Sequence, residues 1–267
     1  MNMQQPWIHR AVQSWIRSTL FAVLGLLPCS AIATSAPQRI VSLDLCMDWN
    51  LAYHANPEQV AALSPLVLQY PVDWLDSDWP THDGSLEDIV QLEPDLILVG
   101  EYSAFLLRER LKSLGYTVEV LPLPTTLKQI EDYERRFFQL IGRNPDLVQP
   151  APPAQTPASH AKRLLLLESN AMGTGRDTFE NQIIEQAGWQ NYLRTAGRGS
   201  LDLEQLITDP PDAVIFDAPT TNALANRFAE HPVLQRSIPA ERWISVEDWR
   251  WQCPGSWSWD LIRQLQP

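Results

Sequence analysis

Two cysteines near opposite ends of the sequence are the first residues whose side chains could do chemistry. Cys46 follows Ser42-Leu-Asp-Leu, and Cys253 stands in Trp251-Gln-Cys-Pro-Gly. Cysteine thiolates act as nucleophiles, bind soft metals or, in an oxidising compartment, pair as a disulfide. The two cysteines could therefore form a disulfide, remain free thiols near a ligand, or ligate a metal.

Phenol and imidazole groups supply a second set of candidate metal ligands. The residues that could ligate iron through such groups are Tyr102, His54, His82 and His231. His54 lies at an expected helix end and His231 precedes a proline, so we expect structural roles for both. Tyr102 and His82 fall in expected loops and stay as candidates.

Two tryptophans flank an arginine near the C-terminus. Trp249-Arg250-Trp251 falls in an expected loop, where indole rings could lie against a flat macrocycle or an aromatic ligand. Arg250 could pair with an anionic group of that ligand. Packing in the core is the alternative, and we expect it for at least one of Trp257 and Trp259.

Common signatures of hydrolytic enzymes are missing from the sequence. It contains neither Gly-x-Ser-x-Gly nor His-Glu-x-x-His, which mark α/β-hydrolases and zinc proteases. Gly173-Thr-Gly175-Arg lacks the Gly-Lys-Ser/Thr ending of a phosphate-binding loop and the full dinucleotide fingerprint, so we interpret it as a flexible loop. We expect no enzymatic activity and no cofactor, with an exported enzyme as the main alternative.

The net charge limits the partners that the chain can take. Lys and Arg number 20 and Asp and Glu number 32, which gives a formal net charge of −12. So acidic a chain cannot bind nucleic acid by releasing counterions from phosphates. It would also be repelled by anionic lipid. We therefore expect a small-molecule ligand, no nucleic-acid partner and a monomer.

The first 33 residues have the order of a secretory signal peptide. A basic, acid-free stretch at 1–17 precedes an apolar run at 20–27, and Ala31-Ile-Ala33 supplies small residues before a cleavage point. The apolar run is shorter than the ~20 residues that span a bilayer. Lipid attachment at Cys29 is the weaker alternative, since Pro28 stands where such sites have a small residue.

Export would place the chain in the periplasm and change its cysteine count. Cleavage after residue 33 removes Cys29, Arg10 and Arg17 but no carboxylate, so the mature chain is more acidic still. It retains an even number of cysteines, Cys46 and Cys253. An even count in an oxidising compartment favours a disulfide.

The helices and strands that must position these side chains show an internal repeat. Residues 85–99 place apolar residues at helical spacing, then Glu93-Pro94-Asp95, then a continuous apolar run. Proline ends the helix, and such a run is typical of a parallel strand covered on both faces. Residues 202–216 repeat this pattern without a gap. Each half also opens with a basic residue and an apolar strand, at 39–43 and at 163–167.

The repeat predicts an α/β fold of two lobes. Between the halves, residues 126–141 predict an amphipathic helix, and five prolines within 144–160 predict an extended linker. The expected domains are a signal peptide at 1–33, an N-terminal lobe at 37–124, a connecting helix and Pro-rich linker at 125–160, and a C-terminal lobe at 161–267.

These motifs, in this order, resemble the substrate-binding components of ABC importers for iron–siderophore complexes, haem and vitamin B12. Cys46 and Cys253 fit the subgroup described as iron-complex binding proteins. The resemblance implies two Rossmann-like lobes joined by an interdomain helix, a ligand cleft between the lobes and a small hinge motion. It spans nearly all of residues 38–265 and rests on Arg39-Ile-Val-Ser-Leu, Leu86-Glu87…Pro94-Asp95, Leu114-Gly-Tyr-Thr-Val, Gly173-Thr-Gly175, Asn181–Gly188 and Leu203-Glu204.

Two features of the chain depart from this family pattern. Prolines at 145–157 fall where the family has a continuous helix. The vitamin B12-binding member carries tryptophans in the loops that here hold residues 81–83 and 100–102. We therefore take an iron–siderophore complex as the first choice of ligand, with a corrinoid or haem as the alternative.

The position of the ligand follows from the parallel strands. In such folds, ligands bind beyond the carboxyl ends of the strands. That rule selects the loops at 44–48, 79–83, 100–103 and 168–175, with 247–257 added if 242–246 is a strand. The ligand-binding candidates in these loops are Asp44, Cys46, His82, Tyr102, Asn170, Thr174, Trp249, Arg250 and Trp251.

Two glutamates occupy equivalent positions in the repeat. Glu87 and Glu204 each lie near the start of a helix, where a carboxylate is favoured by about 0.3–1 kcal/mol. The family resemblance implies that one glutamate per lobe docks on the importer's permease, which works with its ATPase. A disulfide between Cys46 and Cys253 would tether the two lobes and limit their opening. A sensor subunit of the same fold is a further alternative.

Overall fold

The computed structural model describes residues 36–76, 78–217, 223–246 and 249–267. The expected signal peptide and the alternative lipid site at Cys29 lie outside these residues. None of the helices in the described part of the chain is long and apolar enough to cross a membrane.

Four short parallel strands form the sheet of the N-terminal half, in the order β2-β1-β3-β4. They are β1 (Ile40–Ser42), β2 (Val60–Ala62), β3 (Leu96–Gly100) and β4 (Val118–Leu121). The central β1 is buried throughout, and so is β3 up to its final glycine, as expected of continuous apolar runs. The helices are α1 (Leu45–His54), η1 (Pro57–Gln59), α2 (Leu66–Gln69), α3 (Leu86–Gln91) and α4 (Phe105–Ser113).

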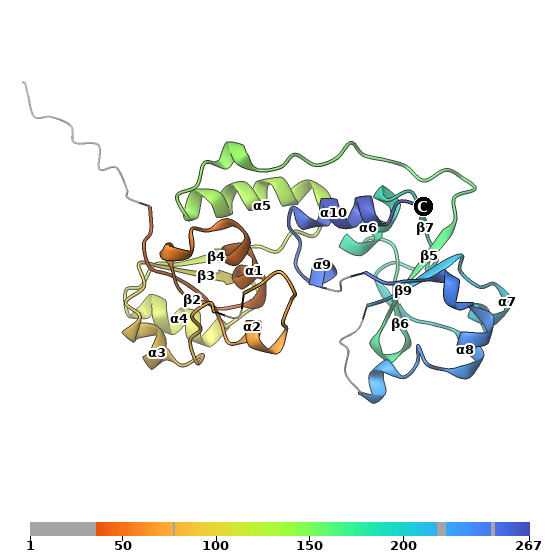
Figure 1. Ribbon diagram of the computed structural model, residues 1–267, viewed down its shortest axis with the longest axis horizontal. Helices are drawn as coiled ribbons and strands as arrows, with labels where there is room; N and C mark the ends of the chain where they lie inside the picture. The colour runs from red at the N-terminus through yellow and green to blue at the C-terminus, as the bar shows by residue number, and fades with distance from the viewer. Residues whose placement is uncertain (1–35, 77, 218–222, 247–248) are drawn as a thin grey trace, which may run out of the picture. The chain divides into compact units, whose positions relative to one another are not determined.

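A second sheet of six strands forms the C-terminal half (Figure 1). Its strands are β5 (Arg163–Glu168), β6 (Met172–Thr174), β7 (Gln190–Asn191), β8 (Arg198–Ser200), β9 (Ala213–Asp217) and β10 (Trp243–Ile244). β7, β5, β9 and β10 are parallel, and β6 and β8 add an antiparallel extension. The helices are η3 (Ser169–Ala171), α6 (Phe179–Gln186), α7 (Leu203–Thr208), η4 (Leu224–Asn226), α8 (Pro232–Ser237), η5 (Ala240–Arg242), α9 (Trp249–Gln252) and α10 (Trp257–Gln264).

The internal repeat is a repeat of structure. Helix α7 and strand β9 have the same lengths as α3 and β3, and the same number of residues separates the helix from the strand in each half. The order of the parallel strands also repeats, since β7-β5-β9-β10 in the C-terminal half corresponds to β2-β1-β3-β4 in the N-terminal half. The pairing register also repeats, since Ile40 lies opposite Leu96 and Leu164 lies opposite Ala213.

An arginine and an aspartate close each half at the amino end of its first strand. The Asp95 carboxylate accepts hydrogen bonds from the backbone N–H groups of Gln38 and Arg39, at 2.7 and 2.9 Å. Asp212 accepts one from the N–H of Arg163 at 2.8 Å. The Pro-Asp pair that stops each helix therefore also fixes the start of the neighbouring strand.

Helix α5 (Leu127–Leu140) connects the two halves. A capping box of Thr126 and Gln129 starts it. Its Phe137 and Phe138 pack in the core of the N-terminal half, whereas Ile130 packs with α6 and α10 in the C-terminal core. At 1.5 Å per residue it is about 21 Å long.

The chain returns to the C-terminal half through the Pro-rich segment. After η2 (Pro145–Leu147), residues 149–162 have no helix or strand, as the prolines predict. Three side chains of the neighbouring helix and strand elements hold this segment. Glu131 accepts from the N–H of Ala151 at 2.6 Å, while Gln186 and Gln190 donate to its carbonyl groups.

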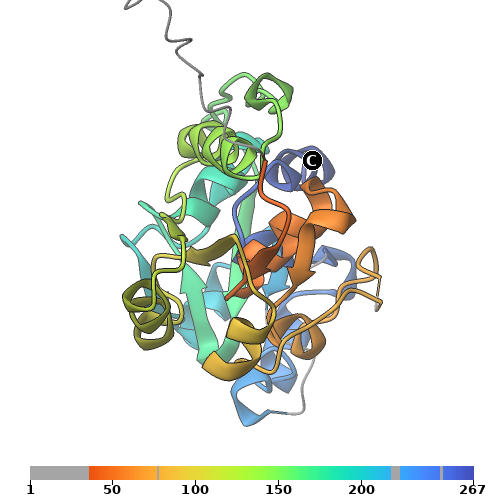
Figure 2. The same ribbon diagram turned by 90° about the vertical axis from the view of Figure 1, so that its left-hand side faces the viewer.

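The C-terminal segment connects the two halves once more. After β10, α9 packs its Trp249 against the N-terminal half, and α10 returns to the C-terminal core. Helix α10 begins beside α5, where the N–H of Ser256 donates to Glu134 at 2.5 Å (Figure 1, Figure 2). Glu134 is 1% exposed and its Oε1 also lies 3.7 Å from His54 Nε2.

Candidate functional site

A disulfide joins Cys46, in the first turn of α1, to Cys253, which follows α9. Cys253 is buried and Cys46 is half-buried. The bond crosses from the N-terminal half to the C-terminal segment. Because both sulfur atoms are used in this disulfide, neither cysteine is a free thiol or a metal ligand.

Four tryptophans surround this disulfide and form what we call the junction cluster: Trp49, Trp74, Trp249 and Trp257. The Trp249 ring centroid lies 5.7 Å from that of Trp49, 5.4 Å from that of Trp74 and 5.4 Å from that of Trp257. Aromatic pairs at such distances contribute about 0.5–1.5 kcal/mol each beyond their burial. The C-terminal segment is thus fixed to the N-terminal half by packing as well as by a covalent bond.

Trp249 and Trp251, which were expected to face a ligand from a loop, are buried in the structure. They stand in the helix α9, where a loop was expected, and their side chains are 6% and 3% exposed. Trp249 belongs to the junction cluster, and Trp251 packs with Trp259 in the C-terminal core. Arg250 Nη1 donates to Gln264 at 3.0 Å, a side-chain contact toward α10.

Asp44, an expected ligand-binding residue, is held inside the protein by hydrogen bonds. It is 5% exposed, caps α1 by accepting from the N–H of Met47 at 3.1 Å, and also accepts from the N–H of Gly100. Burial raises the pKa of Asp44, and the N–H groups of Gly100, Met47 and Cys46 oppose that rise. A carboxylate so placed positions α1 and the end of β3.

A second buried carboxylate, Asp48, lies one turn further along α1. It accepts from the N–H and hydroxyl groups of Ser64 at 2.7 and 2.6 Å. Burial raises the pKa of Asp48 to about 7, although these hydrogen bonds lower it. The pair joins α1 to the segment that follows β2.

His82, which was also expected to bind ligand, makes its hydrogen bonds inside the protein. Its ring is 4% exposed, and the N–H of Gly84 donates to Nδ1 at 2.9 Å. Nε2 therefore carries the proton, and it lies 2.8 Å from the carbonyl of Ser42. His82 fastens the loop before α3 to the end of β1.

The loop after β5 also differs from expectation. Thr174, an expected ligand-binding residue, is fully buried in β6 and donates to Glu168. Gly175 is packed so tightly that a Cβ there would collide with the carbonyl of Thr195, which contradicts a flexible loop. Asn170 is exposed, with a left-handed φ of 59° that asparagine tolerates.

Tyr102 is another predicted ligand-binding residue that stands free of the core. It follows β3 in the loop 100–104, and its side chain is 81% exposed. Phe105 and Leu106 start α4 and are 63% and 83% exposed. These three side chains, which we call the β3 platform, place large apolar groups at the carboxyl end of a central strand.

Phe105 and Leu106 were not predicted as ligand-binding residues, because the sequence of α4 has the pattern of an ordinary amphipathic helix. A possible signal was their position directly after the expected loop, since the first helical turn beyond a parallel strand faces the same edge as that loop. Trp49 and Trp74 of the junction cluster were also missed, because nothing in their local sequence indicates contact with the C-terminus.

Glu87 and Glu204 have matching surroundings. Each is exposed in the first turn of its helix, after the N-caps Ser85 and Asp202. Because α3 and α7 each run into a parallel strand of their own sheet, their first turns lie toward the carboxyl edges of those sheets. The two carboxylates therefore mark equivalent points of the two halves.

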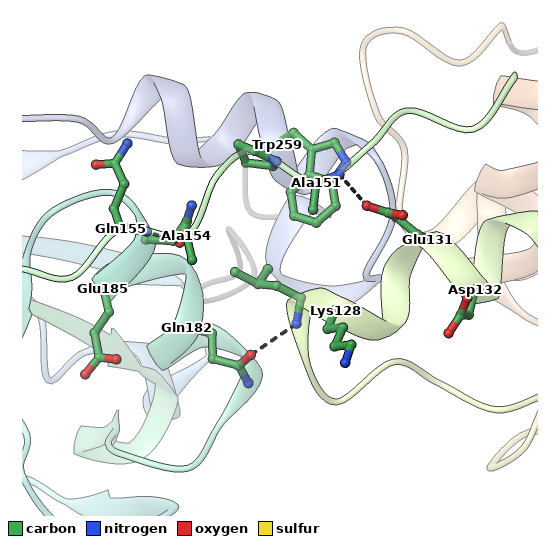
Figure 3. Close-up of a pocket in the computed structure, with 12 residues that line it drawn as sticks. Lys128, Glu131, Asp132, Ala151, Ala154, Gln155, Gln182, Glu185 and Trp259 are labelled. Carbon is green, nitrogen blue, oxygen red and sulfur yellow. Dashed lines mark hydrogen bonds between the residues drawn. The ribbon is translucent and has the colours of Figure 1, made fainter. Parts of the chain in front are cut away.

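A cavity of about 540 Å³ lies elsewhere, under the Pro-rich segment (Figure 3). Lys128 and Asp132 of α5 line it, together with Glu185 of α6 and Trp259 of α10. Several of its polar groups already hold the walls together, as when Gln182 accepts from the N–H of Leu127 at 3.1 Å. This cavity contains none of the ligand-binding residues expected from the sequence.

No family model matches the sequence, and no curated protein matches it. Solved structures do resemble the chain. One is a periplasmic haem-binding protein of Pseudomonas aeruginosa, with a TM-score of 0.62, 20% identity, and coverage of 86% of this chain and 91% of that one.

Two further solved structures that resemble the chain are described as binding other compounds. A possible iron-binding, periplasmic solute-binding protein of Staphylococcus epidermidis has a TM-score of 0.64 and 18% identity, over 87% of this chain and 98% of that one. The periplasmic vitamin B12-binding protein BtuF of Vibrio cholerae has a TM-score of 0.57 and 16% identity, over 85% and 94%. The chain therefore has the two-lobed fold of these periplasmic binding proteins.

Proposed function

We propose that this chain is the exported solute-binding component of an ABC importer, which captures a metal complex of an organic ligand in the periplasm. Its fold is shared with structures described as haem-binding, iron-binding and vitamin B12-binding proteins. An iron–siderophore complex is the first choice of ligand. Haem or a corrinoid is the second candidate, favoured by the apolar character of the β3 platform.

The β3 platform is the observation that carries this proposal. The side chains of Tyr102, Phe105 and Leu106 leave large apolar areas in contact with water. Burying such area against a ligand would gain about 25 cal/mol per Å². Grouped at the carboxyl end of a parallel strand, they suit a ligand with flat or apolar faces. The phenol of Tyr102 adds one polar group that could orient such a ligand.

The proposed mechanism requires only a small movement. Ligand would bind between the carboxyl edges of the two sheets and favour the more closed of two similar arrangements. The disulfide and the junction cluster pin the halves at one point. Lobes connected in this way could rotate slightly about the connection but could not move far apart.

Delivery would use Glu87 and Glu204. Two exposed carboxylates at equivalent points of a repeated unit suit two basic sites on a permease of twofold symmetry. The energy for release would come from the partner ATPase, since the sequence contains no phosphate-binding loop of its own.

The docking half of the proposal is tested by reversing both charges. In the double variant Glu87→Arg, Glu204→Arg, we expect uptake in intact cells to be lost while ligand affinity in solution stays within about twofold, because both residues lie on the surface. The matched control is Glu58→Arg, Glu241→Arg. These two glutamates are also exposed, one in each half, and each precedes a parallel strand at the opposite edge of its sheet.

Uptake that survives in the first variant would refute docking through these glutamates. Equal loss of uptake in both variants would show a general effect of charge. An enzyme is distinguished by a different measurement, in which tryptophan fluorescence follows ligand binding while mass spectrometry follows the ligand. Conversion of the ligand would refute a binding-only role.

A further inference from the structure

We propose that Arg108 is a positioning residue that holds the loop Gly100–Ala104 and so presents the β3 platform in a binding-competent form. Arg108 lies in α4, half-buried behind the loop. The proposal rests on the proposed function in one respect, namely that the β3 platform contacts the ligand. Its structural part, the clamp itself, stands independently of the ligand.

The clamp is made by one nitrogen of the guanidinium. Arg108 Nη1 lies 2.8 Å from the carbonyl oxygen of Glu101, 3.2 Å from that of Gly100 and 3.4 Å from that of Ser103. Hydrogen bonds from a charged donor are stronger than those between neutral groups. The side chain therefore gathers three carbonyl groups of one short loop around a single charge.

The position of this charge needs an explanation other than helix stability. Arg108 stands in the first turns of α4 and reaches back toward the start of the helix. A cation there opposes the helix dipole, which favours anions at the N-terminus. The carbonyl groups of the loop offset that cost, so the arginine is placed for the loop.

The loop requires such a hold because its backbone is strained at one residue. Ala104 has a φ of 48°, in the left-handed region that is unfavourable for a residue with a Cβ. Other contacts hold the first two residues of the loop, and the N–H of Ser103 donates to the carbonyl of Gly100 at 3.1 Å. Asp44 accepts from the N–H of Gly100, and the Glu101 carboxylate accepts from the N–H of Leu123 at 3.0 Å. Tyr102 directly follows these two residues, and its side chain is exposed.

Arg108 also supports the platform directly. Its guanidinium carbon lies 5.0 Å from the centroid of the Phe105 ring, within the range of a cation–π contact. The same side chain thus fixes the backbone below Tyr102 and the ring of Phe105. A platform ordered before ligand arrives binds more tightly, because less conformational entropy is lost on binding.

The test compares Arg108→Met with Arg108→Lys. Methionine keeps an unbranched chain and removes every donor, whereas lysine keeps a positive charge with donors. Arg110→Met is the matched control, since it removes the same charge from an exposed position of the same helix. Hydrogen–deuterium exchange of two loop amides reports the clamp without any ligand: that of Glu101, which donates to the carbonyl of Leu121, and that of Ser103, which donates to the carbonyl of Gly100.

Binding is then measured with three named probes: haemin, cyanocobalamin and a ferric tris-catecholate. For Arg108→Met we expect exchange of the two loop amides to rise about tenfold and the affinity for the probe that binds the wild type to fall about tenfold. Arg108→Lys should recover most of both effects, and Arg110→Met should match the wild type. The melting temperature of each variant shows whether the rest of the fold is intact.

Three outcomes would overturn part of this account. Unchanged exchange in Arg108→Met refutes the clamp, whatever happens to binding. Faster exchange with unchanged affinity refutes the positioning role. If no probe binds the wild type, the proposed ligand class fails, while the exchange rates still decide whether Arg108 holds the loop.

Discussion

The two halves of the molecule are each built on parallel strands in the same order, but they differ at the carboxyl edges of their sheets. In the N-terminal half, β1 leads into α1, whose first turn carries Cys46. In the C-terminal half, β5 leads into the left-handed residues Asn170 and Ala171, followed by the antiparallel β6. The repeated strands therefore fix the framework, while the segments that follow them make each edge different.

The difference extends to how each edge places its carboxylates. Asp44 and Asp48 are buried and accept hydrogen bonds from backbone N–H groups and the Ser64 hydroxyl. Glu168, at the end of β5, instead forms an ion pair with Arg198 at 2.9 Å. A duplicated core can thus support buried carboxylates beside one carboxyl edge and an ion-paired carboxylate at the other.

The largest expected effect concerns the bond that joins the two halves. In Cys46→Ser, Cys253→Ser we expect the free energy of unfolding to fall by about 2–5 kcal/mol, because the disulfide closes a very long loop of the unfolded chain. Urea denaturation of the oxidised wild type and the variant measures the difference. Wild type reduced with dithiothreitol is the control and should match the variant. Equal midpoints before and after reduction would show that the junction cluster alone holds the segment.

An intermediate effect is expected from the buried carboxylate Asp48. Its pKa of about 7 in the folded chain exceeds the ordinary 3.8, so the folded chain binds a proton more readily than the unfolded chain. Its contribution to stability is therefore complete below about pH 4 and is lost as the pH rises through about 7. Asp48→Asn should be more stable than the wild type at pH 8 by about 2 kcal/mol, since it removes a buried charge.

Denaturation at pH 5 and pH 8 tests this interpretation of Asp48. The gain from Asp48→Asn should shrink at pH 5, where the wild-type carboxyl is mostly protonated. Glu168→Gln, at the other edge, is the matched comparison and should show no such gain at pH 8, because its carboxylate is paired with Arg198. A gain of equal size at both pH values would contradict the burial of a titrating charge.

The smallest effects compare the two Arg-Asp closures. Asp95→Ala removes two hydrogen bonds to backbone N–H groups and should cost about 1.5 kcal/mol. Asp212→Ala removes one, and Arg163 keeps its two hydrogen bonds to Asp209, so the cost should be about 0.7 kcal/mol. Urea midpoints of the two variants measure the ratio. A larger loss for Asp212→Ala would show that the closures are not equivalent.

Much of the fold could be predicted from the sequence because its signals are local. The Pro-Asp stop after each helix and the apolar run beyond it fix the bounds of α3, β3, α7 and β9. Prolines likewise predict the extended segment after α5. The short α9 was missed, because four residues rich in tryptophan give no helical period.

The candidate site was less predictable because burial depends on distant contacts. Asp44, His82 and Thr174 stand in the loops that strand topology selects, yet each meets a buried backbone or side-chain partner. Trp249 is covered by Trp49 and Trp74, which lie far away in the sequence. The ligand role of Tyr102 stays a prediction, and the structure shows its side chain exposed after a central strand.

The central claim is that the chain carries a small metal complex on the β3 platform, and native mass spectrometry of the mature protein isolated from the periplasm of its own bacterium tests it most directly. We expect a non-covalent small-molecule adduct on the wild type that is lost in Tyr102→Ala, Phe105→Ala. An adduct that persists in this variant, or a wild type that carries none while its importer is active, would contradict the account.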